Sequence, residues 1–341
     1  MSFTLKGQST LAFTNPPSVA SFGAIVGKKE GEGPYGKCFD RAEQDAYFNQ
    51  KSWEAAESSM FKEAVTTAME KGGFKTSDIN FLASGDLLNQ CTATGYAARK
   101  LAMPYLGLYG ACSTMAESLF VASVLISGGA DRAVAATSSH FCSSERQFRF
   151  PLEYGSQRPP TSQWTDTGAG AVVLENEGNG PYITHATVGK VIDAGIKDAN
   201  NMGAAMAPAF CDTLTRHLTA LNAKSDDYDL IVSGDLGHTG KRIASDLLKQ
   251  EYHINIDKVY QDCGCMIFDS KKQDVHSGGS GCGCSASMLA GYILPQLKKG
   301  KLNRVLFVAT GALMSPTMSC QGESIPSVAH AIEINNNRCE F

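Results

Sequence analysis

Cys112 is the residue whose type and position best suit nucleophilic chemistry. It follows an apolar run at 105–109 that predicts a strand, and it begins a helical stretch that extends to Ser127. A thiol at a helix N-terminus lies near the positive end of the helix dipole and near free backbone N–H groups, and both favour the thiolate. The pattern is compatible with a nucleophile at Cys112, and also with a small buried cysteine in a tight turn.

A cysteine nucleophile needs a base, and two of the seven histidines lie just after predicted strands. His140 follows the predicted strand 132–137, and His238 follows the apolar run that ends near residue 236. In α/β proteins, ligand sites lie at the carboxyl ends of parallel strands. Either histidine could therefore serve as a base, and the sequence does not choose between them.

Carboxylate and guanidinium groups are further candidates for a site. Asp86 and Asp235 each follow a Ser-Gly pair, and each either lines a crevice between two halves of the fold or caps its own turn. Arg146, Arg149 and Arg158 either bind a carboxylate in bidentate fashion or lie in a solvated loop or a dimer contact.

Two Cys-Gly-Cys runs, at 263–265 and 282–284, raise the question of a metal site. A single residue between the cysteines is too short for a structural zinc pair, which needs two to four. The glycine-rich run 278–281 is not followed by the Gly-Lys-Ser/Thr of a phosphate-binding loop. We therefore predict neither a metal nor a bound cofactor.

The elements that must position these residues recur within the chain. The apolar runs 78–87 and 229–236 both end in Ser-Gly-Asp-Leu. The first follows a helical pattern over 53–72, and the second follows one over 209–221. Farther along each half, a Cys-Ser pair opens a helical stretch, and the predicted strands 132–137 and 304–310 follow. This repeated order predicts an α/β fold made of two parallel-sheet units in tandem.

The two halves are predicted to divide in the polar turn after the strand 171–174. This gives an N-terminal half of residues 1–177 and a C-terminal half of residues 178–341. The segment 141–164 has no counterpart in the second half and contains arginines, prolines and aromatic residues. We expect it to be an insertion loop that serves function or subunit contact.

Composition narrows the possible partners and the compartment. The 341 residues carry a net charge of −4, which leaves no basic excess for nucleic acid. No signal peptide and no run of about 18 apolar residues is evident. Eleven cysteines without an export signal indicate reduced thiols. We expect a soluble cytoplasmic protein that reaches a membrane only through partners.

Two motifs resemble those of the thiolase-like family, in its β-ketoacyl synthase III branch. Residues 110–113 (Gly-Ala-Cys-Ser) resemble the nucleophile turn, and residues 166–174 resemble the Asp-Gly-Ala-Gly-Ala strand. The resemblance implies two pseudo-symmetric halves in an αβαβα layered arrangement. It also implies a homodimer in which the first sheets pair across a two-fold axis.

The chain departs from the condensing enzymes at the positions that handle protons. Residues 233–236 stand where those enzymes have a His-Gln-Ala-Asn-like stretch, and 279–281 stand where they have Gly-Asn-Thr-Ser. Decarboxylation and Claisen condensation need such groups to stabilise an enolate or oxyanion. The departures favour a binding protein, with an acyl-transferring enzyme that uses Cys112 as nucleophile as the alternative.

Nearly the whole chain is similar to the stage V sporulation protein AD family of spore-forming bacteria. The resemblance is carried by residues 83–90, 136–140, 145–149, 202–209, 278–282, 303–306 and 323–326. It implies a component of the machinery that moves dipicolinic acid into the developing spore and that itself binds dipicolinate. Integral membrane subunits would hold it at the forespore or spore inner membrane, and calcium could enter with the ligand.

The ancestral acyl pocket is the expected dipicolinate site. A flat dianion suits a dry crevice with helix N-terminal N–H groups and nearby cations. The residues expected to bind it are Cys112, His140, Arg146, Arg149, Asp86, Asp235 and Ser280. A third hypothesis is a scaffold that has lost its pocket and only contacts membrane subunits.

Overall fold

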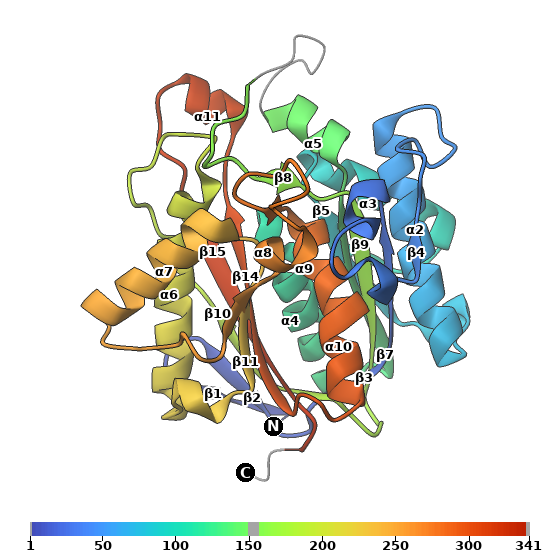
Figure 1. Cartoon of the computed structure of the whole chain (residues 1–341). Helices are drawn as coiled ribbons and strands as arrows, with labels where there is room; N and C mark the ends of the chain where they lie inside the picture. The colour runs from blue at the N-terminus through green and yellow to red at the C-terminus, as the bar shows by residue number, and fades with distance from the viewer. Residues whose placement is uncertain (1, 149–156, 339–341) are drawn as a thin grey trace.

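Two groups of five strands lie at the centre of the molecule (Figure 1). The computed structural model describes residues 2–148 and 157–338. Within these ranges, the first group has the order β3 (Ser18–Val26), β9 (Gly168–Glu175), β7 (Arg132–Ser139), β5 (Phe81–Asp86) and β6 (Tyr105–Gly107). The second has the order β10 (Tyr182–Val188), β15 (Ser327–Asn335), β14 (Arg304–Ala312), β11 (Leu230–Ser233) and β12 (Tyr260–Asp262).

The two groups share one pattern of strand directions. In each, the first three strands are antiparallel to their neighbours, and the last two run parallel to the third. A single residue pair, Ser18 with Tyr182, joins β3 to β10 and links the groups. The fold therefore consists of two pseudo-symmetric halves, as the internal repeat predicts.

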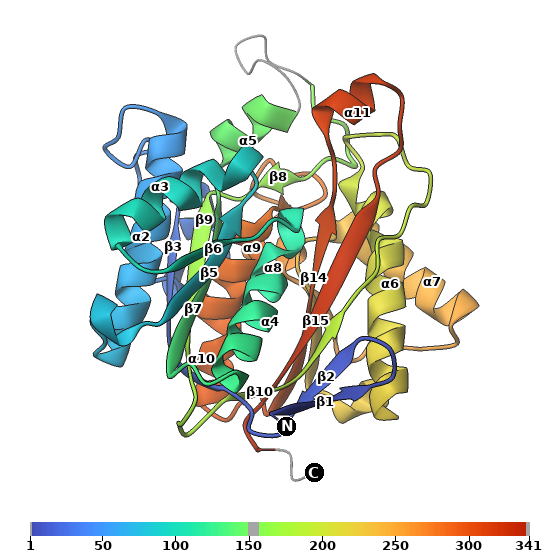
Figure 2. The same ribbon diagram turned by 180° about the vertical axis from the view of Figure 1, so that it is seen from behind.

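Helices form three layers around and between the two groups of strands (Figures 1 and 2). The outer helices are α2 (Trp53–Gly72) and α3 (Thr92–Leu101) on the first half, and α6 (Met202–Leu221) and α7 (Gly237–Glu251) on the second. The central layer contains α4 (Thr114–Ser127), α9 (Cys282–Met288) and α10 (Leu294–Lys298). The shorter elements are α1 (Lys28–Gly31), β4 (Arg41–Ala42), α8 (Cys263–Ile267) and α11 (Pro316–Cys320). This is the αβαβα arrangement that the resemblance implies.

Within the described ranges, no helix combines the length and apolar character needed to cross a bilayer.

Helix α2 shows why the outer helices can be read from the sequence. The Ser52 side chain caps its N-terminus by accepting a hydrogen bond from the Ala55 N–H, and Gly73 ends it in the left-handed conformation. Met60 and Ala64, four residues apart, are fully buried. Burial of a methionine side chain stabilises the fold by roughly 1.5–3 kcal/mol. The predicted bounds of this helix are confirmed.

Helix α6 begins seven residues earlier than the sequence pattern predicts. The pattern predicts a helix over 209–221, directly after Pro208. In the structure the Asn201 side chain accepts a hydrogen bond from the Ala204 N–H and caps the helix, and Pro208 lies inside it. Met202 and Met206 in the added turns are buried, so tertiary packing offsets the hydrogen bond that proline cannot make.

The segment 141–164 is more ordered than a loop in its described parts. It begins with helix α5 (Phe141–Phe148), and it ends at strand β8 (Trp164–Thr165). Strand β8 pairs with β13 (Gly279–Ser280), which belongs to the second half. The segment therefore connects the two halves at the top of the molecule in Figure 1.

The N-terminal hairpin crosses the predicted division between the halves. Its strands are β1 (Phe3–Lys6) and β2 (Thr10–Phe13), and β2 pairs with β10 of the second half. The predicted division itself falls in the turn between β9 and β10. The first residues of the chain therefore extend the sheet of the second half.

Candidate functional site

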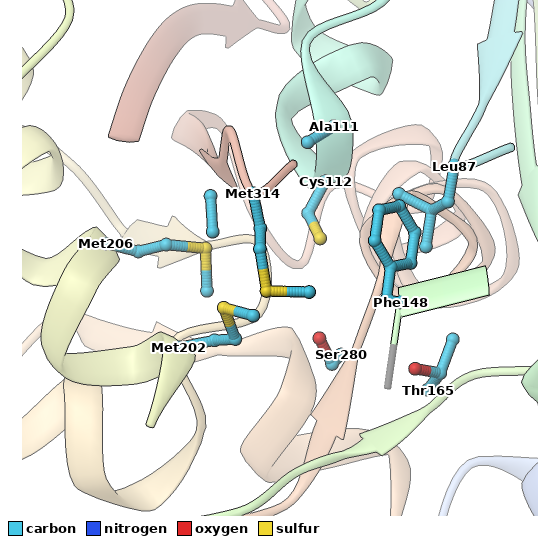
Figure 3. A pocket seen from close by; sticks show the side chains of 10 residues that line it. Leu87, Ala111, Cys112, Phe148, Thr165, Met202, Met206, Ser280 and Met314 are labelled. Carbon is cyan, nitrogen blue, oxygen red and sulfur yellow. The ribbon is translucent and has the colours of Figure 1, made fainter. Parts of the chain in front are cut away.

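A hollow opens near the carboxyl ends of the strands, between the two halves (Figure 3). Its volume, counted together with the open solvent at its mouth, is about 420 Å³. The lining residues are Leu87, Ala111, Cys112, Phe148, Thr165, Met202, Met206, Ser280, Ala312 and Met314. The wall is mainly apolar, and its polar groups are one thiol and two hydroxyls. None of the described lining residues is charged.

Cys112 lies in a single 3₁₀ turn, Ala111–Ser113, that leads into α4. Burial raises the pKa of its thiol well above the ordinary value, and the negative charge and hydrogen bond of Asp235 add to the shift. The backbone N–H of Gly281 acts in the opposite direction and favours the thiolate. The helix-terminus argument for a thiolate is therefore wrong here, because burial and a neighbouring carboxylate outweigh the helix dipole.

Asp235 is the acidic neighbour of this thiol. Its Oδ2 accepts hydrogen bonds from the Gly281 N–H at 2.7 Å and from the Ser280 hydroxyl at 3.3 Å. Its Oδ1 accepts a hydrogen bond from the Thr310 hydroxyl at 3.2 Å. Burial raises the pKa of Asp235 to about 7, although these hydrogen bonds act in the opposite direction. The structure thus brings Cys112, Asp235 and Ser280 together.

His140 lies away from the Cys112 hollow. Its Nε2 donates a hydrogen bond to the Ala46 carbonyl at 2.8 Å, and its Nδ1 accepts one from the Cys142 N–H at 3.2 Å. Burial lowers its pKa, so the imidazole is neutral. It lines a separate hollow beside Trp164, and both of its nitrogens are occupied. His238, the other predicted base, is exposed at the start of α7. Neither histidine is placed to accept a proton from Cys112.

The predicted arginines have other partners. Arg146 forms an ion pair with Glu54, and its guanidinium lies 5.1 Å from the ring of Trp53. Arg158 pairs with Asp274 at 2.7 Å. Arg149 lies outside the described residues. The structure therefore does not bring Arg146 into the hollow.

Asp86, the counterpart of Asp235 in the repeat, acts as a turn cap. Its Oδ1 accepts a hydrogen bond from the Leu88 N–H, and its Oδ2 accepts two from the N–H and hydroxyl of Thr94, each at 2.8 Å. These bonds hold the turn between β5 and α3, and only the neighbouring Leu87 lines the hollow. Of the two interpretations left open for Asp86, the structure favours the cap.

The methionine wall is the part of the hollow that sequence reasoning missed. Met202 and Met206 come from α6, and Met314 follows β14; all three point into the hollow (Figure 3). The spacing of four residues between Met202 and Met206 was the available signal, since it places them on one helical face. The sequence pattern predicts this helix only from residue 209, so it does not indicate the face that carries Met202 and Met206.

Close packing surrounds Gly234, which follows β11 (Leu230–Ser233). A Cβ atom at Gly234 would lie 3.2 Å from the Ala309 Cα and 3.3 Å from the Ser285 Cβ, so a side chain there would need its neighbours to move. Cys282 packs against Cys112, and its thiol donates a hydrogen bond to the Ser138 carbonyl at 3.0 Å. Within residues 2–148 and 157–338, no three histidine, cysteine or acidic side chains are grouped so as to hold a metal ion.

Several solved structures share this fold at low sequence identity. The 3-oxoacyl-[acyl-carrier-protein] synthase III of Aquifex aeolicus VF5 is 12% identical, with a TM-score of 0.53, over 94% of this chain and 99% of that one. Cerulenin-bound OleA of Xanthomonas campestris is 13% identical, with a TM-score of 0.58, over 94% and 98%. Identities this low show the thiolase-like fold and nothing about activity.

Sequence comparison is far more specific. The family model described as stage V sporulation protein AD matches residues 7–335. Stage V sporulation protein AD of Bacillus subtilis (strain 168) is 49% identical over 329 residues, which is 96% of this chain and 97% of that protein. With its thiolase-like fold and its departures from the condensing enzymes, the chain belongs to the stage V sporulation protein AD family.

Proposed function

We propose that the chain binds dipicolinate in the hollow beside Cys112 and works as a non-catalytic component of the sporulation machinery that moves this ligand. The observation that carries the proposal is the pairing of Cys112 with a buried carboxyl group, Asp235, in place of a histidine. The hollow of a condensing enzyme is kept, and neither His140 nor His238 is placed to act as its base.

The charges around Cys112 oppose acyl transfer. A cysteine attacks a thioester as the thiolate, and it needs a base or positive charge to reach that state. Asp235 instead adds negative charge beside the sulfur and raises the pKa of the thiol. Donors for a developing oxyanion are also needed, and the Gly281 N–H is already bonded to Asp235.

The wall of the hollow suits a flat aromatic ring. Methionine sulfur atoms make favourable contacts with aromatic rings, and flexible methionine side chains adapt to the shape of a ligand. Met202, Met206 and Met314 supply such contacts on one side, and Phe148 and Leu87 lie on the other (Figure 3). The Ser280 hydroxyl and the Cys112 thiol lie between them, where a ligand carboxylate could be bound.

The cellular role follows from family membership. We propose that the chain acts in the cytoplasm, that integral membrane subunits of the same machinery hold it at the forespore or spore inner membrane, and that it passes dipicolinate to them. The shared fold with condensing enzymes supports descent from an enzyme whose pocket was adapted to binding.

Calorimetric titration with dipicolinate tests the proposal. We expect saturable binding by the wild-type protein and at least tenfold weaker binding by Met202→Glu, because the new carboxylate would repel the dianion inside the hollow. Met318→Glu is the matched control, since Met318 is 46% exposed and does not line the hollow. Benzene-1,3-dicarboxylate, which lacks the ring nitrogen, and added calcium report on the chemistry that is recognised.

The competing hypotheses give different results in the same assay. An acyl-transferring enzyme would form a thioester on Cys112 with an acyl-coenzyme A, visible by mass spectrometry, and would give no heat with dipicolinate. A scaffold would respond to neither compound. Either result would contradict the proposal.

A further inference from the structure

Asp235 lies directly behind the polar part of the hollow, where it contacts two of the groups that a carboxylate ligand would meet. The aspartate side chain is fully buried and does not itself line the hollow. It accepts a hydrogen bond from the Ser280 hydroxyl at 3.3 Å, and it forms a hydrogen bond with the Cys112 thiol. Both of these groups do line the hollow.

The direction of the bond between Ser280 and Asp235 depends on one proton. A serine hydroxyl has a single hydrogen. When Asp235 is ionised, that hydrogen points back to the carboxylate, and Ser280 shows only lone pairs to the hollow. When Asp235 is protonated, its own O–H can donate to the Ser280 oxygen. The serine hydrogen is then free to point into the hollow.

The charges around Asp235 also favour its protonated form. The titratable groups that face Asp235 from the packed elements are all acids or thiols: Asp262, Asp166, Cys112, Cys263, Cys282 and Cys284. Thr165, the other hydroxyl of the hollow, already donates its hydrogen to Glu145 at 2.8 Å. An ionised Asp235 would therefore oppose a dianionic ligand without a compensating cation among these groups.

We propose that a carboxylate ligand enters the hollow together with one proton taken from solvent by Asp235, which turns the Ser280 hydroxyl from a donor to Asp235 into a donor to the ligand. Asp235 is thus a positioning residue that acts through Ser280. This inference deepens the proposed function and rests on it.

The pH range of the effect follows from the surroundings of the carboxyl group. Burial raises the pKa of Asp235 to about 7, so the free protein already carries the proton below that pH and lacks it above. Proton uptake on binding should approach one above pH 8 and vanish below pH 6. The association constant should fall roughly tenfold for each pH unit above 7.

Calorimetry in buffers of different ionisation enthalpy measures this proton directly. Dipicolinate is titrated into the wild-type protein at pH 6, 7 and 8, and the dependence of the heat on buffer gives the number of protons taken up. We expect close to none at pH 6 and close to one at pH 8. This measurement needs no variant.

Two variants assign the proton to Asp235. Asp235→Asn keeps the shape and cannot ionise, and its amide oxygen can still accept from the Gly281 N–H in place of Oδ2. We expect it to bind without proton uptake and with a constant affinity between pH 7 and pH 8. Glu30→Gln is the matched control, because Glu30 is a buried carboxyl whose pKa is also raised to about 7 and which lies at the separate hollow beside His140. It should keep the proton uptake of the wild type.

The possible failures are distinct. Binding without proton uptake at pH 8 would overturn the inference and leave the proposed function in place, as would undiminished uptake by Asp235→Asn. No binding at any pH would remove the proposed function and the inference together.

Discussion

At Cys112 two opposing electrostatic effects meet, and burial decides between them. The start of α4 supplies a positive dipole end, which lowers a thiol pKa within about one helical turn. Burial of the sulfur and the nearby Asp235 carboxyl act the other way and together raise the pKa. A helix N-terminus therefore does not by itself make a cysteine reactive.

We predict slow alkylation of Cys112 by iodoacetamide at pH 7.5. Its rate should be at least tenfold below that of the exposed Cys38 and Cys320, because both its burial and its raised pKa reduce attack. Asp235→Asn should speed the reaction at Cys112, since the negative neighbour is lost while the burial stays. Peptide mass spectrometry over time gives the rates, and selective fast labelling of wild-type Cys112 would contradict the prediction.

The residues of the site differ in how far the sequence could place them. Cys112 could be placed because it lies in a turn after a strand at this edge of the fold, whereas Ser280 belongs to the short strand β13 that leads into α9. His140 occupies such a turn too, yet its imidazole bonds to the Ala46 carbonyl on the other side of α5. The chain position of a residue predicts the edge of the sheet. It does not predict the direction in which the side chain leaves that edge.

At the scale of elements, close packing of α9 on β9 fixes the central layer. A Cβ atom at Gly170 would lie only 2.2 Å from the Ala286 carbonyl oxygen, so the helix can approach the strand only because this residue is glycine. Helix α9 begins directly after Ser280 and Gly281. The packing of α9 on β9 therefore also sets the position of the Ser280 hydroxyl.

Two glycine-to-alanine changes should have effects of opposite sign. Gly170→Ala should lower the free energy of unfolding by roughly 1–3 kcal/mol, because the new methyl group overpacks the contact with α9. Gly95→Ala in α3 meets open space, and it should raise that free energy by about 0.5–1 kcal/mol through helix propensity. Urea denaturation measures both, and equal effects would show that the contact does not constrain α9.

Elements were predictable where local signals agree with packing. Helix α2 has a serine cap, a terminal glycine and one apolar face, so its bounds follow from the sequence. Helix α6 has Pro208 in its interior, and the local signal is overridden by burial of the two methionines before it. The sequence pattern therefore misses Met202 and Met206, two of the three methionines that line the hollow.

At the scale of the molecule, the free edge of the first half is the surface that bears on assembly. Strand β6 ends the strand order on that side. Leu106, Tyr109 and Tyr96 are 41%, 43% and 58% exposed there or on the adjoining α3 and loop. Exposed apolar side chains at an open sheet edge favour pairing with another chain. We propose that two copies pair through this edge, as the thiolase-like family implies.

Light scattering coupled to size exclusion tests the pairing. The wild-type protein should have the mass of two chains, and Leu106→Asp should have the mass of one, because a charge would be buried in the contact. Val191→Asp is the control, since Val191 is 58% exposed in the second half, away from this edge. A monomeric wild type, or a dimer that survives Leu106→Asp, would contradict the proposed surface.

The overall architecture could be predicted from the sequence because the same order of elements occurs twice in the chain. Matching Ser-Gly-Asp-Leu turns and matching strands after a Cys-Ser pair predict two similar units, and the strand directions of the halves agree. The crossing of the N-terminal hairpin to the second half was not accessible. It rests on pairing between β2 and β10, which are more than 160 residues apart.

The hollow draws its wall from both halves, with Cys112 in the turn before α4 and Ser280, Met202 and Met314 contributed by the second half. Strand pairing between the two sheets is limited to Ser18 with Tyr182, although α4 and α9 each pack against strands of the opposite half and against each other. A molecule bound in the hollow would contact both halves and would add to these connections. We therefore expect the halves to separate less readily, and the protein to melt at a higher temperature, when the hollow is occupied.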